Sequence, residues 1–551
     1  MKEKAFNQKI TFCWLIFMLM PLIQCSESMA TLETPVITLI KPVTVEGITI
    51  SVYPDQVIRT IPREIFGTNI EWFNNGNDFW QPQDQRISPR LSELLADQGV
   101  DLIRFPGGTL SDFYDWHDGI GPQSSRPVRP HHTDPGSSAN TFGSPELLQL
   151  CRTTSSTPLI TVNVGTGTPE MAAGWVAYMN NANNIQRQED GQTLPLPVQY
   201  WEIGNELYLN GSDAEKSITI GPEEYAERYL KYASTMKAVD PAIKLIALGR
   251  ASSYNIPFGP YENWNTTVLE RAGKEIDVIA LHNAYFPMLL DDDKNRTPEE
   301  VYTAMWSAPL AVDEDLNRLE TLIQKYEEKK EINIAITEWG AFFSMSNPVF
   351  MDQVKTLGSA VYVARMMQVF LSHPKVMIAN YFKFTDPTFM GWVNYAAEPK
   401  IPFYAFQMYA QHFGTQLIKS EIKSPLFSST KIGLLNARTN IPELNVIAAT
   451  NSSKTKLYIN IVSCSWDKTQ QISLDLHTFD AAEAAIKRSI SGPSPLANNG
   501  PDLPSWWPVP YQEPADKQIP PVTIQTTPWN INEKLFIPPH SIITIELDKK
   551  I

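Results

Sequence analysis

The sequence is poor in cysteine. It contains 4 Cys in 551 residues, and only Cys151 and Cys464 lie beyond the first 30 positions. Two cysteines so far apart exclude a disulfide framework as the basis of the fold. No group of Cys or His residues has the spacing of metal ligands either. We therefore expect a fold that is stabilised by its hydrophobic core.

Positive charge is also scarce. The chain has 45 Lys and Arg against 60 Asp and Glu, which gives a formal net charge of −15. An acidic chain without a basic run is not expected to bind nucleic acid or an anionic membrane. Its hydrophobic content of 43% and charged content of 19% are typical of globular proteins, and the length predicts roughly two to four domains. No oligomeric state follows from these values.

The N-terminus has the composition of a targeting segment. Three lysines precede an apolar stretch from Ile10 to Ile23, and Ser28-Met29-Ala30 offers small residues for a signal peptidase. The apolar stretch is short for a stable membrane span. We expect residues 1–30 to be a signal peptide and the mature protein to be secreted or periplasmic. An uncleaved anchor, or a lipid attached to Cys25, is the alternative.

Short apolar runs alternate with helical patterns between about residues 64 and 385. The predicted strands are Glu64–Phe73, Val100–Gly108, Pro158–Gly165, Gln199–Glu206, Lys244–Gly249, Asp277–Tyr285, Asn333–Trp339 and Val376–Thr385. Predicted helices include one that begins near Pro222 and one over Asp313–Lys330. Eight strands alternating with helices predict a (β/α)8 barrel over residues 64–400. A doubly wound open sheet is the competing topology, but no Gly-rich phosphate loop follows the first strand.

The pattern of apolar residues changes beyond about residue 400, where helical periodicity ends. The predicted strands here are Leu444–Ala449, Leu457–Val462, Gln471–Leu476 and Ser541–Leu547. They predict an all-β sandwich domain over residues 401–551. The stretch Val43–Arg59 alternates in the same way, so we expect residues 31–63 to join that sandwich.

Two of the predicted barrel strands end in a glutamate. Glu206 ends the fourth strand and Glu338 ends the seventh. Functional residues of such barrels lie at the C-terminal strand ends, so these two carboxylates can face each other across the mouth. Cleavage of a glycosidic bond needs such a pair, one to donate a proton and one to attack or to activate water. Taken singly, either glutamate is equally compatible with a strand cap or an ion pair.

Other polar residues end further strands. Glu71 ends the first strand, where it can accept hydrogen bonds from sugar hydroxyls or pair with Arg104. His282 and Tyr285 end the sixth strand, where a hydrogen bond to the nucleophilic carboxylate would fix its charge. The alternative for both is ordinary packing in the core. Two glycines follow Arg104 closely and permit either close approach of a ligand or a tight turn.

Several motifs together carry a family resemblance. They are Gly67-Thr-Asn-Ile-Glu71, Arg104-Phe-Pro-Gly-Gly108, Trp116-His-Asp-Gly-Ile-Gly-Pro122, Arg126-Pro127, Gly204-Asn-Glu206 and Glu338-Trp339. With them the chain resembles glycoside hydrolase family 51, the α-L-arabinofuranosidases, over nearly its whole length beyond the N-terminus. The Gly-Asn-Glu and Glu-Trp motifs are shared by a wider clan of barrel glycosidases.

The resemblance implies a barrel followed by a β-sandwich, a retaining mechanism, and neither metal nor cofactor. It implies Glu206 as the acid/base and Glu338 as the nucleophile. Asn205 would bind the sugar 2-hydroxyl, Glu71 would hold the sugar in the subsite that is cleaved, and Tyr285 would orient Glu338. The expected partner is a plant-type polysaccharide or oligosaccharide.

The chain departs from the family pattern at three places that touch the sugar. Thr109 stands where the family usually has Asn, the polar stretch His131–Ser138 replaces a Trp-bearing loop, and His282 is followed by Asn-Ala-Tyr. Release of α-L-arabinofuranosyl residues is the expected activity. Endoglucanase, xylosidase or hexuronidase activity, or an inactive carbohydrate-binding protein, are the alternatives.

Overall fold

The computed structural model describes residues 43–550, except 133–135, 211, 252–261, 283–294, 327–329, 342, 344–351, 386–389, 395, 501–517 and 519. The expected signal peptide over residues 1–30 and the candidate site residue Tyr285 lie outside the described residues. Among the described residues, no helix combines the length and the apolar character needed to cross a bilayer.

Eight parallel strands close into a barrel in chain order. They are β2 (Gly67–Asn69), β5 (Leu102–Phe105), β8 (Thr157–Val162), β9 (Tyr200–Ile203), β10 (Lys244–Leu248), β11 (Val278–Leu281), β12 (Asn333–Trp339) and β13 (Val376–Tyr381). Each coincides with a predicted apolar run. The (β/α)8 barrel is thereby confirmed, and the doubly wound alternative is wrong.

Alternation along the strands decides which side chains fill the barrel. Leu102, Leu159 and Tyr200 belong to a small buried cluster to which seven of the eight strands contribute, as expected for the barrel interior. Two positions further along β5 and β9 stand Arg104 and Glu202, both fully buried. The interior is therefore apolar in one layer and charged in the next, toward the C-terminal strand ends.

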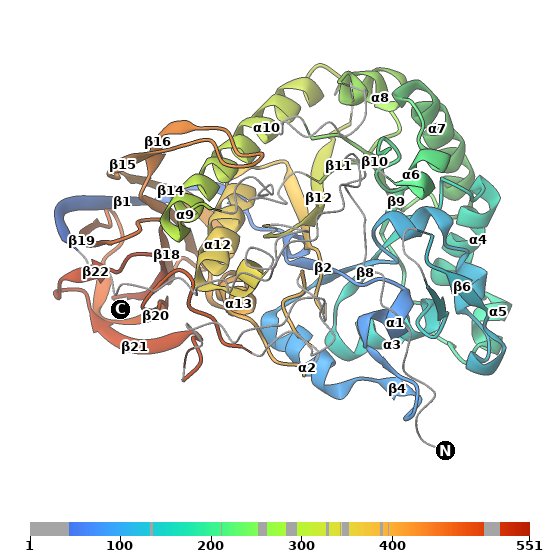
Figure 1. The fold of residues 1–551 in the computed structure, drawn as a ribbon, viewed down its shortest axis with the longest axis horizontal. Coiled ribbons are helices and arrows are strands. Elements are labelled where there is room, and N and C mark those ends of the chain that lie inside the picture. Colours follow the sequence, from blue (N-terminus) through green and yellow to red (C-terminus); the bar gives the residue numbers. More distant parts are fainter. Residues whose placement is uncertain are drawn as a thin grey trace, which may run out of the picture.

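Helices surround the barrel (Figure 1). The longer ones are α2 (Pro89–Gln98), α3 (Ser144–Thr154), α4 (Pro169–Asn180), α7 (Pro222–Val239), α8 (Trp264–Ala272), α10 (Ser307–Ile323), α12 (Leu357–Ser372) and α13 (Ile401–His412). Shorter elements are α1 (Phe73–Asn77), α5 (Ile185–Glu189), α6 (Asp213–Ile218), α9 (Pro298–Met305), and the 3-10 turns η1 (Arg63–Ile65), η2 (Thr109–Phe113), η3 (Trp116–Gly119), η4 (Gln123–Ser125) and η6 (Asp352–Lys355).

The two predicted helices are present, one with shifted bounds. Helix α7 begins at Pro222, where a proline lacks an N–H that would be unpaired anyway, and buries Tyr225 and Tyr229 on one face. Helix α10 begins before the expected Asp313, because Pro309 fits its first turn, and ends at Ile323 rather than at residue 330.

A nine-stranded sheet forms the second unit. Its strands are β1 (Val43–Thr60), β14 (Gln416–Ile422), β17 (Leu444–Thr450), β18 (Lys456–Ser463), β19 (Lys468–Asp475), β20 (Ala481–Ile490), β21 (Gln525–Asn530), β22 (Leu535–Ile537) and β23 (Ser541–Lys549), in the order β21-β20-β23-β18-β17-β14-β1-β19-β22. All nine strands contribute to one buried apolar cluster, so the sheet curls around a core of its own. Two-stranded sheets are β15 (Leu426–Ser429) with β16 (Arg438–Pro442), β3 (Trp80–Gln81) with β4 (Arg86–Ile87), and β6 (Val128–Pro130) with β7 (Ser137–Ala139).

Strand β1 ties the two ends of the described chain together. It pairs antiparallel with β14 and parallel with β19. Figure 1 shows this blue strand among the orange and red strands of the C-terminal sheet.

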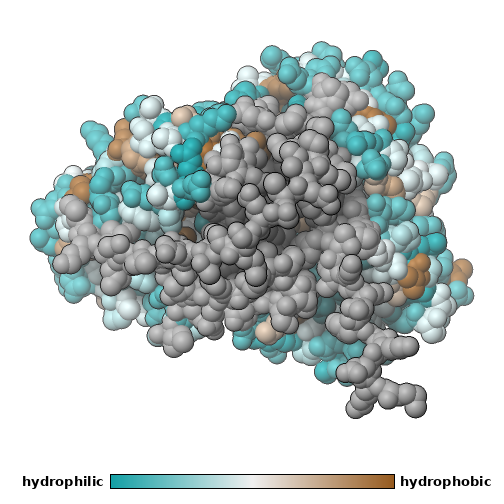
Figure 2. Space-filling view, viewed as in Figure 1, coloured by the Kyte–Doolittle hydropathy of each residue, from teal (hydrophilic) through white to brown (hydrophobic). Residues whose placement is uncertain are grey.

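Helices α12 and α13 connect the barrel to the sheet, because Gln368 and Tyr409 both donate hydrogen bonds to Oδ1 of Asn460, at 2.9 and 2.6 Å. On the face in Figure 2, hydrophobic residues of the coloured surface are scattered rather than gathered in one patch.

Candidate active site

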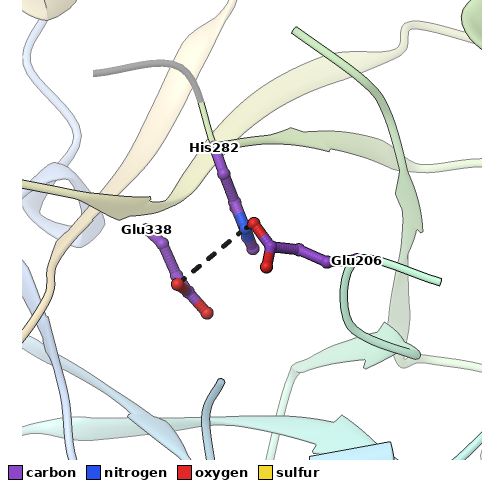
Figure 3. A group of neighbouring side chains, drawn as sticks. All are labelled: Glu206, His282 and Glu338. Carbon is purple, nitrogen blue, oxygen red and sulfur yellow. Dashed lines mark hydrogen bonds and ion pairs between the residues drawn. The ribbon is translucent and has the colours of Figure 1, made fainter. Parts of the chain in front are cut away.

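The two strand-end glutamates face each other at the barrel mouth. Glu206 follows β9, and Glu338 lies in the last part of β12. Figure 3 shows both side chains converging with that of His282, which follows β11. One carboxylate oxygen of each glutamate and a ring nitrogen of His282 all lie within 4.8 Å of one another. The structure therefore brings three of the predicted site residues into one cluster.

The turn after β9 sets the position of Glu206. Gly204 has a φ of 84° and Glu206 itself has a φ of 44°, so the chain bends sharply here through the left-handed region. Asp112 fixes this turn, because its Oδ2 accepts the backbone N–H of Asn205 at 2.8 Å. Its Oδ1 accepts the N–H groups of residues 164 and 165 after β8. Burial raises the pKa of Asp112 to about 7, although these backbone donors lower it.

Arg104 lies at the centre of the site, fully buried. Its Nε donates to Glu202 Oε2 at 2.6 Å, and its Nη1 donates to Glu338 Oε1 at 2.7 Å and Asn69 Oδ1 at 3.0 Å. Its Nη2 donates to Asn205 Oδ1 at 2.8 Å. Burial opposes the charge of the guanidinium, but the two carboxylates outweigh burial and raise its pKa. Arg104 is therefore a fixed positive charge against Glu338.

His282 lies closer to Glu206 than to Glu338. Its Nδ1 lies 2.6 Å from Glu206 Oε1 and 3.9 Å from Glu338 Oε2. Its Nε2 lies 2.9 Å from the Thr337 hydroxyl, which orients the ring. The hydrogen bond that the sequence led us to expect with the nucleophile is thus made with Glu206.

Glu206 and His282 shift each other's pKa. Burial raises the pKa of Glu206, the charge of His282 lowers it, and the charge of Glu338 raises it again. Burial lowers the pKa of His282, but the two carboxylates outweigh burial and raise it overall. Both shifts favour one additional proton on the pair. A carboxyl group with a raised pKa is suited to donate a proton.

Glu71 and Asn205 border the same site. The Glu71 carboxylate forms an ion pair with Lys383, after β13, rather than with Arg104, which is engaged by Glu202 and Glu338. The Asn205 side chain accepts from Arg104, and its Nδ2 is buried without a hydrogen-bond partner among the described residues. That amide nitrogen is a free donor at the mouth.

Sequence reasoning missed several members of the cluster. Glu202, Asp112, Thr337 and Lys383 were not proposed, although Glu202 carried a signal. It is a charged residue at an inward position of an apolar strand, where only a paired charge is tolerated.

The cluster of Glu206, His282 and Glu338 is close enough to coordinate a metal ion, but the cation bound to Glu338 is Arg104, which disfavours that use.

Family models match two long segments of the chain. One described as "Alpha-L-arabinofuranosidase 1 domain" matches residues 94–277, and one described as "Alpha-L-arabinofuranosidase C-terminal domain" matches residues 337–511. The first segment contains Arg104 and Glu206, and the second contains Glu338.

Sequence relatives extend over most of the chain. An "Intracellular exo-alpha-L-arabinofuranosidase" of Bacteroides ovatus is 25% identical over 460 residues, 79% of this chain and 85% of that protein. An "Intracellular exo-alpha-(1->5)-L-arabinofuranosidase" of Acetivibrio thermocellus is 24% identical, over 74% of this chain and 83% of that protein. "Alpha-L-arabinofuranosidase C" of Emericella nidulans is 32% identical over a shorter segment, 36% of this chain and 41% of that protein.

Solved structures share the whole architecture. The α-L-arabinofuranosidase of Thermotoga maritima, in an arabinose complex, has a TM-score of 0.75 at 24% identity, covering 91% of this chain and all of that one. A family 51 α-L-arabinofuranosidase of Thermotoga petrophila has a TM-score of 0.74 at 23% identity, with 91% of this chain and all of that one covered. At such identities the likeness supports the fold, a barrel with a β-sandwich.

The expected location is corrected by these relatives. The sequence predicted a secreted or periplasmic protein, with lipid attachment at Cys25 as the alternative. The relatives from Bacteroides ovatus and Acetivibrio thermocellus, which cover most of the chain, are both named intracellular. The prediction was wrong because lysines followed by a short apolar stretch are a pattern of composition alone.

Proposed function

The chain belongs to glycoside hydrolase family 51, the α-L-arabinofuranosidases, and we propose that it is a retaining exo-α-L-arabinofuranosidase. The observation that carries this proposal is the facing pair Glu206 and Glu338, with oxygens no more than 4.8 Å apart. Retaining glycosidases hold their carboxyl groups about 5–5.5 Å apart, whereas inverting ones need about 6.5–9.5 Å for a water between them. The short separation supports direct attack by one carboxylate.

In the first step Glu338 attacks the anomeric carbon of the arabinofuranosyl unit. The bond from that carbon to the leaving oxygen breaks, and Glu206 gives its proton to that oxygen. Arg104 supports this assignment, because a guanidinium at 2.7 Å stabilises Glu338 as a carboxylate. The raised pKa of Glu206 supports its role as the acid.

In the second step a water molecule replaces the departed group. Glu206 removes a proton from the water, the water oxygen bonds to the anomeric carbon, and the ester to Glu338 breaks. The product keeps the configuration of the substrate because the carbon is inverted twice. His282 holds the Glu206 carboxyl group in place through its hydrogen bond with Oε1.

Two neighbours supply contacts for the sugar. The unpartnered Nδ2 of Asn205 would donate to the 2-hydroxyl, since Arg104 already holds the other end of that amide. Glu71 would accept from other hydroxyls, and its ion pair with Lys383 fixes the position of its carboxylate. Tyr285, the remaining predicted member, is proposed to orient Glu338.

The proposed function also implies how the chain divides into domains. We propose that the catalytic barrel covers residues 64–400 and that residues 31–63 join residues 401–551 in the β-sandwich. The place of β1 between β14 and β19 supports this division.

Assay of a panel of nitrophenyl glycosides tests the proposal. We expect turnover of the α-L-arabinofuranoside, and loss of about ten-thousand-fold in kcat/KM for Glu338→Gln. Glu170→Gln, the same change at an exposed position on α4, should leave activity intact. Turnover of only a glucoside, xyloside or hexuronide would overturn the substrate assignment. If wild type and Glu338→Gln were equally silent but bound polysaccharide, the chain would be a binding protein.

A further inference from the structure

A polar cavity lies between the barrel and the sheet. Its volume is about 480 Å³, within the range of small-molecule sites. Helix α12 contributes Arg365, Gln368 and Ser372, which share one face because they are three and four residues apart. Strands β14 and β17 and the chain around Lys423 form the facing wall. Figure 1 shows α12 next to the C-terminal sheet, near β14.

The charges of this cavity are all of one sign. Arg365 and Lys423 line it, and none of its thirteen lining residues is Asp or Glu. This is unusual for a chain with a formal net charge of −15. Neither cation makes a hydrogen bond or an ion pair with any residue that the structure describes. The cavity therefore offers two uncompensated positive charges.

The nearest carboxylates are already bound elsewhere. The charge of Asp313 raises the pKa of Arg365. Asp313 Oδ1, however, lies 3.1 Å from Nε2 of His373, with which it forms an ion pair. Glu443 lies between two lining residues of the cavity, yet its carboxylate accepts hydrogen bonds from Lys468 and Gln470. No carboxylate in the described part of the chain neutralises the cavity.

Arg365, which is partly exposed, differs from three arginines in the described part of the protein whose side chains are largely buried. Arg104 binds two carboxylates, Arg126 forms two hydrogen bonds with Glu146, and Arg187 donates to four backbone carbonyls. Burial lowers the pKa of Arg365, which indicates that its charge lacks a sufficient partner. A guanidinium with five unused donors in a partly buried position is destabilising unless a ligand accepts from it.

The lining also indicates the class of ligand. It contains no aromatic side chain, so it has no surface on which a sugar ring could stack. It does contain hydroxyl and amide groups, such as those of Ser420 and Asn445, beside the two cations. The planar fork of Arg365 matches an oxyanion with two oxygens, and Lys423 adds a point charge.

We propose that this cavity binds a small oxyanion, a phosphate or a carboxylate group, held by Arg365 and Lys423. Such a ligand would accept hydrogen bonds from α12 on one side and from the sheet on the other. It would thereby join the barrel to the C-terminal sheet. The site is separate from the glutamate pair, so it stands independently of the proposed glycosidase activity.

Isothermal titration with inorganic phosphate and with citrate tests the proposal. We expect saturable binding of at least one anion to the wild-type protein at one site per chain. Arg365→Gln and Lys423→Gln should each weaken it about ten-fold or more, because each removes a charged hydrogen-bond donor. Arg90→Gln, which removes the same charge from an exposed position on α2, should bind as wild type does. Binding of phosphate alone identifies a phosphate site, and binding of citrate alone identifies a carboxylate site.

Two outcomes would overturn the oxyanion site. One is the absence of saturable binding of either anion, and the other is unchanged binding by Lys423→Gln, whose exposed side chain can be replaced without disturbing the core. Urea denaturation of all three variants checks that they are folded. A crystal soaked in selenate should show anomalous density at Arg365.

Discussion

The barrel mouth and the interior of the C-terminal sheet are both buried, but they are built from opposite kinds of side chain. The mouth buries Arg104 in ion pairs with Glu202 and Glu338, whereas the sheet interior contains residues such as Ile459 and Ile545. Burial of an isoleucine stabilises a fold by about 1.5–3 kcal/mol. Burial of an ion pair contributes little net stability, because desolvation offsets the attraction between the charges.

This difference indicates what each region is for. The sheet interior can be explained by stability alone. The mouth cannot, because an apolar cluster of the same size would stabilise the barrel at least as well. A buried network that adds little stability agrees with the active site proposed here, and the comparison can be tested by removing one residue from each region.

The largest effect is expected for Arg104→Gln. This change leaves the carboxylates of Glu202 and Glu338 buried without their cation, and should lower the free energy of unfolding by about 3–5 kcal/mol. Activity should fall about a hundred-fold or more, since the charge beside the nucleophile is lost. Urea denaturation and kcat/KM measure the two effects. Arg90→Gln serves as control, and equal behaviour of the two variants would refute the proposed role of the network.

A smaller and purely structural effect is expected for Ile545→Ala. Ile545 is fully buried in the core of the sheet, and its truncation should lower the free energy of unfolding by about 2–5 kcal/mol. At 25 °C the folded variant should retain wild-type kcat and KM. A loss of kcat without unfolding would show that the sheet interior takes part in activity, and the contrast between the regions would fail.

The smallest effect is expected for His282→Asn, seen in the pH profile. The charge of His282 lowers the pKa of Glu206, so its removal should raise that pKa further. Because Glu206 must be protonated for the first step, the alkaline limb of kcat/KM should move to higher pH. Thr337→Val removes only the hydrogen bond between the Thr337 hydroxyl and the ring of His282, and should shift the alkaline limb less. An unchanged or lower alkaline limb would contradict the pairing of His282 with Glu206.

The barrel and its glutamate pair were predictable because they depend on local patterns. Each barrel strand is a short apolar run, and Glu206 and Glu338 stand where two such runs end. Their facing arrangement followed from counting strands. The partners of Arg104 were not predictable in the same way. Glu202 lies on β9, across β8 from β5, and Glu338 lies on β12, which comes near β5 only when the sheet closes into a barrel.

Strand β20 shows a second limit of sequence reasoning. Its residues, Ala481–Ile490, include four alanines, a glutamate, a lysine and an arginine, which favour a helix on intrinsic propensity. It was not among the predicted strands. Antiparallel pairing with β21 and β23 on its two sides overrides that preference.

The stereochemistry of the first product tests the central claim most directly. Hydrolysis of nitrophenyl α-L-arabinofuranoside should be followed by proton NMR before the sugar equilibrates between its anomers. If Glu338 forms a covalent intermediate that Glu206 helps water to resolve, the α-anomer appears first. If the β-anomer appears first, the two carboxylates do not act as a retaining pair.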